Sequence, residues 1–371
     1  GNQDGNSIGD FYYEPPTDYL ALCTSNLSDP EIKLPGDNFN TVLYTGDGAD
    51  DHAITGVGFQ PDLVWLKRRD GTDQNIFYDI ARGVSVYIQS PSDDGNNVET
   101  NGIAFDTDGF TLNDYGGQNG SGETYAGWSW LGANATVTNT DGTNIDSTVS
   151  ANPTAGFSIC KYTATHTIAD SFGHGLAQKP ELLIFKNLDR AFGSSAIANW
   201  TTFSDQLTAD YSTALALNEG GAETGYNGLN TTAPTASVVE LGSNDGTNYG
   251  TDDYICYCFH SVEGYSKIGS YEGNANADGT FVYTGFRPAF IIMKNVDATA
   301  NWHLYDDKRP GYNVVDEALF PNLNDPADSE IDIDIVSNGF KARRDSSGFN
   351  NAVTYMFYAV AKSPFKYANA R

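Results

Sequence analysis

Two tryptophans at matching places in the chain are the first residues that could bind a ligand. Each follows an asparagine and precedes an aspartate by a few residues. A sugar site combines an aromatic platform with a few fixed polar groups, because Trp and Tyr have an apolar face and a polar tip. The candidate ligand-binding residues are Trp200, Trp302, Tyr305 and Asp306. The alternative is that both tryptophans pack in a core, and Ile76 at the matching position of an earlier segment favours this alternative.

A second candidate site is the segment Phe105-Asp-Thr-Asp-Gly-Phe110, which could hold a metal ion. Its carboxylates, Asp106 and Asp108, are hard oxygen ligands that suit Ca²⁺, although the glutamate at position twelve of an EF-hand loop is missing. Asp-Gly pairs are also preferred in β-hairpin turns. We favour the turn, and Ca²⁺ is the one cofactor that the sequence suggests.

Motifs for catalysis are absent from the sequence. Five histidines are present without a GxSxG, HExxH or glycine-rich phosphate-loop motif beside them. Four cysteines without a CxxC spacing predict neither a zinc site nor a redox pair, and we expect Cys256 and Cys258 to be buried free thiols. We predict that the protein is not an enzyme.

Three lysines recur at the ends of similar apolar segments, and each is followed three residues later by an aspartate. The lysines are Lys67, Lys186 and Lys294, and the aspartates are Asp70, Asp189 and Asp297. We expect surface ion pairs that fix the following turn, which would stabilise it by only about 0–1 kcal/mol.

Composition excludes two classes of function. The chain has 371 residues, with 48 acidic and 20 basic side chains and a net charge of −28, so it lacks the basic surface of a nucleic-acid binder. Apolar runs such as Ala289 to Met293 are far shorter than the roughly 18 residues of a membrane span. Such a negative field should also repel anionic cell surfaces, so we expect any attachment to a host to strengthen as salt or Ca²⁺ rises.

Internal repeats are the most specific signal and supply the elements that must position these residues. An opening segment recurs as Val42 to Gly46, Ile159 to Thr163 and Ile268 to Gly273. An apolar segment that ends in lysine follows as Gly58 to Lys67, Gly175 to Lys186 and Gly285 to Lys294. An aromatic segment closes each repeat as Tyr125 to Trp130, Tyr254 to Phe259 and Tyr355 to Val360. The recurring lysines lie 119 and 108 residues apart, and repeats of this length fit whole domains better than solenoid units.

The fold predicted from this pattern is all-β, with three tandem antiparallel β-sandwich domains of the jelly-roll or concanavalin-like kind. The short apolar runs are aromatic or β-branched and are bounded by Gly, Asn, Asp and Pro. Runs that are apolar at every position, such as Leu63 to Leu66, predict strands covered on both faces. The predicted boundaries are an extended arm over 1–38, repeats over 39–134, 155–262 and 263–371, and a polar linker over 135–154.

These repeats and the ending Ser363-Pro-Phe-Lys-Tyr-Ala-Asn-Ala-Arg371 resemble tail-associated virion proteins of marine bacteriophages. In that family, concanavalin-like repeats often follow a SPRY-like domain. The segment Phe11 to Leu27 is similar to the last strand and exit of such a domain, which predicts that the chain is the C-terminal part of a longer protein. The family supplies no catalytic residues.

The resemblance implies a virion protein that is extracellular after release. The leading hypothesis is a tail-fibre or appendage-type adhesin that contacts a host surface glycan or protein. The alternative is a purely structural component, such as a capsid decoration or tail-knob protein, that binds other virion proteins. A homotrimer is plausible for fibre proteins, but the three repeats within one chain could replace it.

Overall fold

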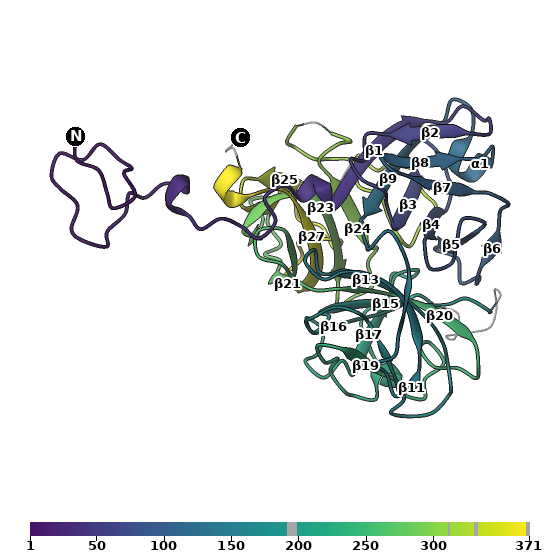
Figure 1. Ribbon diagram of the computed structural model, residues 1–371. Coiled ribbons are helices and arrows are strands. Elements are labelled where there is room, and N and C mark those ends of the chain that lie inside the picture. The colour runs from purple at the N-terminus through teal and green to yellow at the C-terminus, as the bar shows by residue number, and fades with distance from the viewer. Residues whose placement is uncertain (191–198, 311, 330–332, 369–371) are drawn as a thin grey trace.

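The structure is a computed structural model, and it describes residues 1–190, 199–310, 312–329 and 333–368 (Figure 1). Strands dominate it, and the one α-helix among the described residues, α1, is a single turn at Gly116–Asn119. Within the described ranges, all pairs of strands are antiparallel except β11 with β14. The predicted all-β, antiparallel fold class is confirmed.

The sheets fall into three pairs, each with one large and one small sheet, and we call these pairs units 1, 2 and 3. The large sheet of unit 1 contains, in spatial order, β1 (Phe39–Thr45), β9 (Thr124–Trp130), β3 (Leu63–Arg68), β4 (Asn75–Asp79), β5 (Val86–Ser90) and β6 (Asn97–Val98). Its small sheet contains β2 (His52–Thr55), β8 (Gly109–Leu112) and β7 (Ile103–Asp106).

Units 2 and 3 follow the same plan. The large sheet of unit 2 contains β10 (Val137–Asn139), β12 (Ser147–Asn152), β13 (Phe157–Thr163), β20 (Asp253–Phe259), β15 (Leu182–Asn187), β16 (Thr201–Ser204), β17 (Thr213–Ala216) and β18 (Thr224–Gly225). Its small sheet contains β11 (Asn144–Ile145), β14 (Ser171–Gly173) and β19 (Val238–Glu240). The large sheet of unit 3 contains β21 (Ser266–Glu272), β27 (Thr354–Pro364), β23 (Phe286–Asn295) and β24 (His303–Asp306). Its small sheet contains β22 (Phe281–Tyr283), β26 (Gly339–Ala342) and β25 (Ile333–Val336).

The repeats recognised in the sequence correspond to equivalent strands. In each large sheet the opening strand pairs with the closing strand, which pairs with the strand that ends in the recurring lysine. The registers agree as well, with equivalent cross-strand pairs at Phe39 and Trp130, Phe157 and Phe259, and Ser266 and Val360. By contrast, residues 135–154 were expected to form a linker, yet they contribute β10, β11 and β12 to the sheets of unit 2.

The apolar strand β3 is buried on both faces, as its sequence predicts. Its side chains alternate between the two faces of the sheet. Val64 and Leu66 pack into the core of unit 1, whereas Leu63 and Trp65 pack into a second core. The equivalent strands β15 and β23 alternate in the same way.

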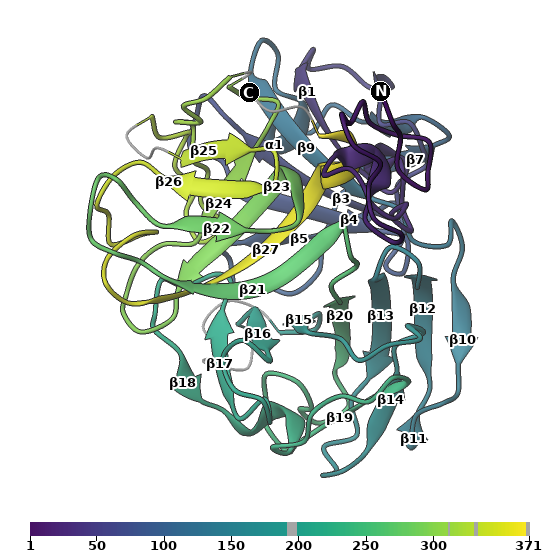
Figure 2. The ribbon, with the colours of Figure 1, turned by 90° about the vertical axis from the view of Figure 1, so that its left-hand side faces the viewer.

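This second core is shared by all three units. In Figure 2 the strands of unit 2 lie below those of unit 3, and the strands of unit 1 lie behind unit 3. Its large side chains include Trp65, Trp128, Trp200, Tyr257, Phe290, Trp302 and Tyr358. Each large sheet thus covers its own core with one face and the shared core with the other. The units are therefore parts of one packed body.

The N-terminal arm leaves this body, as Figure 1 shows. Its short 3-10 turns lie at Thr24–Asn26 and Pro35–Asp37, and two others occur at Asn227–Leu229 and Phe365–Tyr367. Ile32 packs into the shared core and fixes the root of the arm.

Candidate functional site

The two tryptophans proposed as a sugar platform lie in the interior between units. Trp200 and Trp302 are almost completely buried. The indole Nε1 of Trp200 donates to the carbonyl of Gln89 in unit 1, at 3.0 Å. Trp302 makes the equivalent bond to Ala216 in unit 2, at 2.9 Å. Their position supports the core alternative, because no surface ligand can reach them.

The register of the strands identifies the residue of unit 1 that is equivalent to Trp200 and Trp302. The register of β3 with β4 places Asn75, rather than Ile76, at the tryptophan position, and Ile76 points into the core of unit 1. The side-chain amide of Asn75 donates to the carbonyl of Phe320 in unit 3, at 3.2 Å. Unit 1 therefore bonds to unit 3, unit 3 to unit 2 and unit 2 to unit 1, which closes a ring.

A second ring is made by backbone groups of three equivalent loops. The loops lie between β5 and β6, between β17 and β18, and between β24 and β25, and each reaches the turn after the recurring lysine of the next unit. The bonds join Asn96 N to Leu188 O at 2.8 Å, Glu223 N to Val296 O at 2.9 Å, and Ala327 N to Arg69 O at 2.9 Å. The two rings give the molecule an approximate threefold arrangement within one chain.

Tyr305 and Asp306, the other candidate ligand residues, are also buried. Tyr305 packs in the core of unit 3. Asp306 forms a fully buried ion pair with Arg309 at 2.6 Å and accepts a hydrogen bond from Trp128 of unit 1 at 3.2 Å. A buried charge must be paired to be tolerated, so these contacts assign Asp306 to the interface between units.

The recurring lysines are buried, and the predicted surface ion pairs are wrong. Lys67 donates to the carbonyl of Asn324 in unit 3 at 3.0 Å, and Lys186 donates to that of Asp93 in unit 1 at 2.9 Å. Desolvation lowers the pKa of Lys67 to about 8 and that of Lys186 to about 7. Lys294 is equally buried.

The aspartates that follow these lysines have a different structural role. Each carboxylate accepts a hydrogen bond from the first backbone N–H of the closing strand. These pairs are Asp70 with Thr124 at 3.0 Å, Asp189 with Asp253 at 2.7 Å, and Asp297 with Thr354 at 2.8 Å. The aspartates thus fix the start of the closing strand.

Asp106 and Asp108 lie in the exposed hairpin between β7 and β8. Asp106 accepts a hydrogen bond from the hydroxyl of Thr111 at 2.7 Å, and Asp108 accepts one from Gly58 N at 2.6 Å. Within the described ranges, no group of three His, Cys, Asp or Glu side chains could hold a metal ion. The two hydrogen bonds fit the turn, and Ca²⁺ binding by Asp106 and Asp108 stays a prediction. Cys256 and Cys258 are buried free thiols, as expected.

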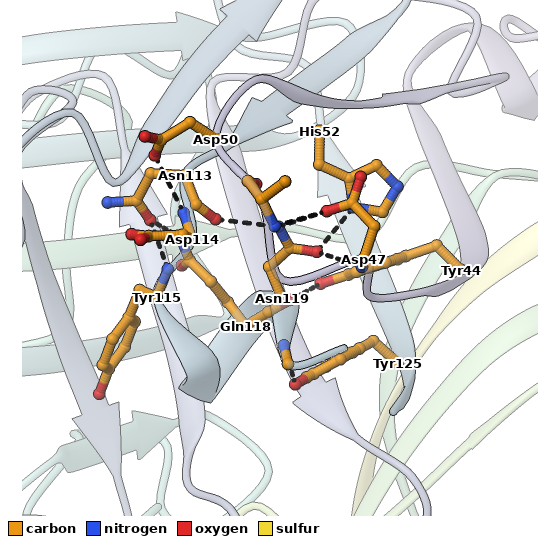
Figure 3. A network of polar contacts seen from close by, with 12 residues as sticks. Tyr44, Asp47, Asp50, His52, Asn113, Asp114, Tyr115, Gln118, Asn119 and Tyr125 are labelled. Atoms are coloured by element: carbon orange, nitrogen blue, oxygen red, sulfur yellow. Dashed lines mark hydrogen bonds and ion pairs between the residues drawn. The ribbon is translucent and has the colours of Figure 1, made fainter. Parts of the chain in front are cut away.

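The candidate functional surface lies at a loop that the sequence analysis missed, and Figure 3 shows it in unit 1. Asn119 is buried beneath this loop. Its Oδ1 accepts hydrogen bonds from Asp47 N at 3.0 Å and from His52 Nδ1 at 2.7 Å. Its Nδ2 donates to the carbonyls of Ala49 at 2.9 Å and Asn113 at 3.0 Å. One side chain thereby joins two loops that are far apart in the sequence.

We call this arrangement, in which one buried asparagine side chain joins two loops, the asparagine hub, and it recurs in the other two units. Asn248 Oδ1 accepts from Thr165 N at 3.0 Å, and its Nδ2 donates to the carbonyl of Thr167 at 3.0 Å. Asn350 makes the equivalent bonds to Asn274 N at 3.2 Å and to the carbonyl of Asn276 at 2.8 Å. The sequence signal was an asparagine five or six residues before the tyrosine that opens each closing strand.

Stacked tyrosines hold the same loops from below. The ring pairs are Tyr44 with Tyr125, Tyr162 with Tyr254, and Tyr271 with Tyr355, with centroids 5.0, 5.5 and 5.1 Å apart. Hydroxyls of both rings in each pair donate to loop carbonyls, as Tyr44 does to Gln118 at 2.7 Å. The hub and the tyrosine stack hold these loops in place at one end of each unit, and we call this end the loop end of the unit.

The exposed side chains of these three loop ends differ. Unit 1 presents acids, including Asp50 and Asp114. Unit 2 presents His166 beside Tyr249, whose ring also lies under the guanidinium of Arg190. The loop of unit 3 exposes the amides of Asn274 and Asn276 and the single carboxylate of Asp278. One scaffold therefore carries three surfaces of different chemistry.

These features define an all-β protein in which three pairs of sheets close around a shared core. The chain belongs to the DUF7483 family, described as a domain of unknown function, whose match covers residues 34–364. That match begins just before β1, ends with β27 and spans all three units. No curated protein and no solved structure matches the chain. Among the described helices, none is long and apolar enough to cross a membrane.

Proposed function

We propose that the protein is a virion attachment protein whose three loop ends contact a host surface glycan or protein. The observation that carries this proposal is the asparagine hub, which fixes the same loop in every unit while the exposed residues vary. A binding protein needs surfaces held in place before the ligand arrives, because ordering a loop on binding costs free energy. The bacteriophage resemblance supplies the virion context.

The position of the loop ends supports this proposal. Opening strands begin beside the arm and the connections between units, and they run toward the loop ends, as the pairing of Thr45 with Thr124 in unit 1 shows. Figure 1 places α1, which belongs to the loop end of unit 1, on the side away from the arm. An arm that joins other virion proteins would therefore leave this loop end facing outward.

Binding of the full chain to host cells tests the proposal. We expect Asp114→Ala and His166→Ala to change binding, whereas Asp37→Ala, an exposed acid near the root of the arm, should leave it unchanged. Because of the net charge of −28, wild-type binding should strengthen as NaCl rises. Absence of binding at high protein concentration, or strongest binding in salt-free buffer, would count against an adhesin.

The alternative function is a structural virion component, and exposed apolar side chains on the arm favour it. The arm exposes Tyr12, Tyr13 and Leu22 to 87%, 79% and 107%. Exposed apolar side chains of this kind mark surfaces that contact other proteins. Labelling the protein in intact particles separates the two functions. Loop ends that face solvent favour attachment, and loop ends sealed against the shell or tube favour the structural role.

A further inference from the structure

A groove of about 580 Å³ lies at the opposite strand ends from the three loop ends. The root of the arm forms one wall, the connection between units 2 and 3 forms another, and the turn after β22 forms the third. Ligand sites in proteins usually enclose about 300–1,000 Å³, so the groove has the volume of a binding site.

The walls of the groove are fixed by contacts among themselves. Lys366 donates to the carbonyl of Leu27 and pairs with Asp29, both at 2.7 Å, which ties the arm to the end of β27. Gly264 turns the connecting segment with a φ of +76°, and a Cβ there would lie 3.3 Å from Pro30 and 3.6 Å from Pro364. A preformed groove loses little entropy when it binds a ligand.

Its rim presents an aromatic face together with carboxylates. Tyr283 is 56% exposed, and the ammonium of Lys267 lies 5.3 Å from its ring centroid and donates to its carbonyl at 2.8 Å. Glu31 and Glu263 line the groove and are exposed, and no hydrogen bond or ion pair to either carboxylate exists within the described part of the chain. These carboxylates are acceptors for hydroxyl groups of a ligand.

We propose that this groove binds a neutral saccharide, with one sugar ring packed against Tyr283 and its hydroxyls donating to Glu31 and Glu263. The charges select the ligand class. The groove is lined by the three carboxylates of Asp29, Glu31 and Glu263 and by the two ammonium groups of Lys267 and Lys366, so its net charge is −1 and disfavours a uronate or a sulfated sugar. The inference goes beyond the three loop ends and rests on the proposed attachment function only for its biological setting.

Binding of defined trisaccharides to the full chain tests this inference. The probes are maltotriose, mannotriose and triacetylchitotriose, with trigalacturonate as the charged comparison, measured by saturation-transfer NMR and calorimetry. We expect at least one neutral probe to bind in the millimolar range and trigalacturonate to bind more weakly. Loss of the aromatic contact in Tyr283→Ala should weaken binding about tenfold.

Two further variants complete the test. Glu263→Gln should weaken binding by about threefold, because a charged acceptor is replaced by a neutral one. Tyr19→Ala is the matched control, since it removes another exposed tyrosine, 69% exposed, that lies on the arm outside the groove. Failure of all neutral probes, equal binding by Tyr283→Ala, or preference for trigalacturonate would overturn the inference.

The outcome is distinguishable from that of the cell-binding test. If cells bind the wild type and Tyr283→Ala equally while no trisaccharide binds, attachment stands and the saccharide groove falls. If a neutral trisaccharide binds through Tyr283 but host cells do not bind, the groove stands and the attachment function falls.

Discussion

At the scale of residues, Lys186 shows how a recurring side chain serves the fold. Its amine is fully buried and donates to a carbonyl of the neighbouring unit, and desolvation lowers its pKa from 10.5 to about 7. The unfolded chain then binds a proton between about pH 7 and pH 10.5 that the folded chain does not. The free energy of unfolding should therefore rise with pH in this window.

The expected slope can be measured with a variant. Each unit of pKa difference corresponds to about 1.4 kcal/mol, so urea unfolding between about pH 7 and pH 9 should show a clear increase in stability. Lys186→Met should reduce this slope without removing it, because burial also lowers the pKa of Lys67, to about 8, whereas Lys308→Met, at an exposed lysine, should leave it unchanged. A Lys186→Met slope parallel to that of the wild type would contradict the burial of this amine.

The asparagine hub predicts a contrast between two neighbouring residues. Asn350→Ala removes donors to the carbonyls of Asn276 and Arg344, which lie 2.8 and 3.0 Å from Nδ2, and should lower the free energy of unfolding by about 2–4 kcal/mol. Asn351→Ala, at the exposed next position, should change it by less than about 0.5 kcal/mol. Urea titrations followed by tryptophan fluorescence provide the comparison, and equal effects would argue against a hub.

Sequence reasoning found many of these residues but misjudged their surroundings. The recurrence of Lys67 and Trp200 was visible, yet a single strand does not reveal that a second unit covers its other face. The missing third tryptophan position also depended on register, because a shift of one residue exchanges Ile76 for Asn75. Asn119 could not be singled out from the sequence, because many other asparagines occur in turns.

At the scale of elements, the strands were predictable and their extent was not. Alternation and turn residues located the opening, lysine-ended and closing strands of every unit. The segment 135–154 resembles a linker in composition because its strands β10 and β11 lie at sheet edges and expose polar side chains. Edge strands with polar residues carry a weak pattern in the sequence.

The loops that join the units give a prediction at this scale. Gly95 packs so closely on unit 2 that a Cβ would lie 2.3 Å from the carbonyl of Leu188. Gly95→Ala should displace this loop, break the bond from Asn96 to Leu188 and cost about 1–3 kcal/mol. Gly221→Ala is the matched control, because it lies in the equivalent loop of unit 2 with open space around it. Thermal unfolding of both variants checks the difference, and equal midpoints would contradict the close packing.

At the scale of the whole molecule, the shared core makes the three units interdependent. The large sheets each bury their second face against the other two units, so removing one unit would expose apolar surface on both of its neighbours. A small-angle scattering measurement on the full chain therefore tests the central claim most directly.

A compact chain of this length should give a radius of gyration of about 21 Å, raised slightly by the arm. Three units of about 13 Å each, strung in a line about 30 Å apart, would instead give roughly 28 Å and an elongated distance distribution. The closed arrangement predicts the smaller value with a single compact peak. A value near the larger one would contradict it.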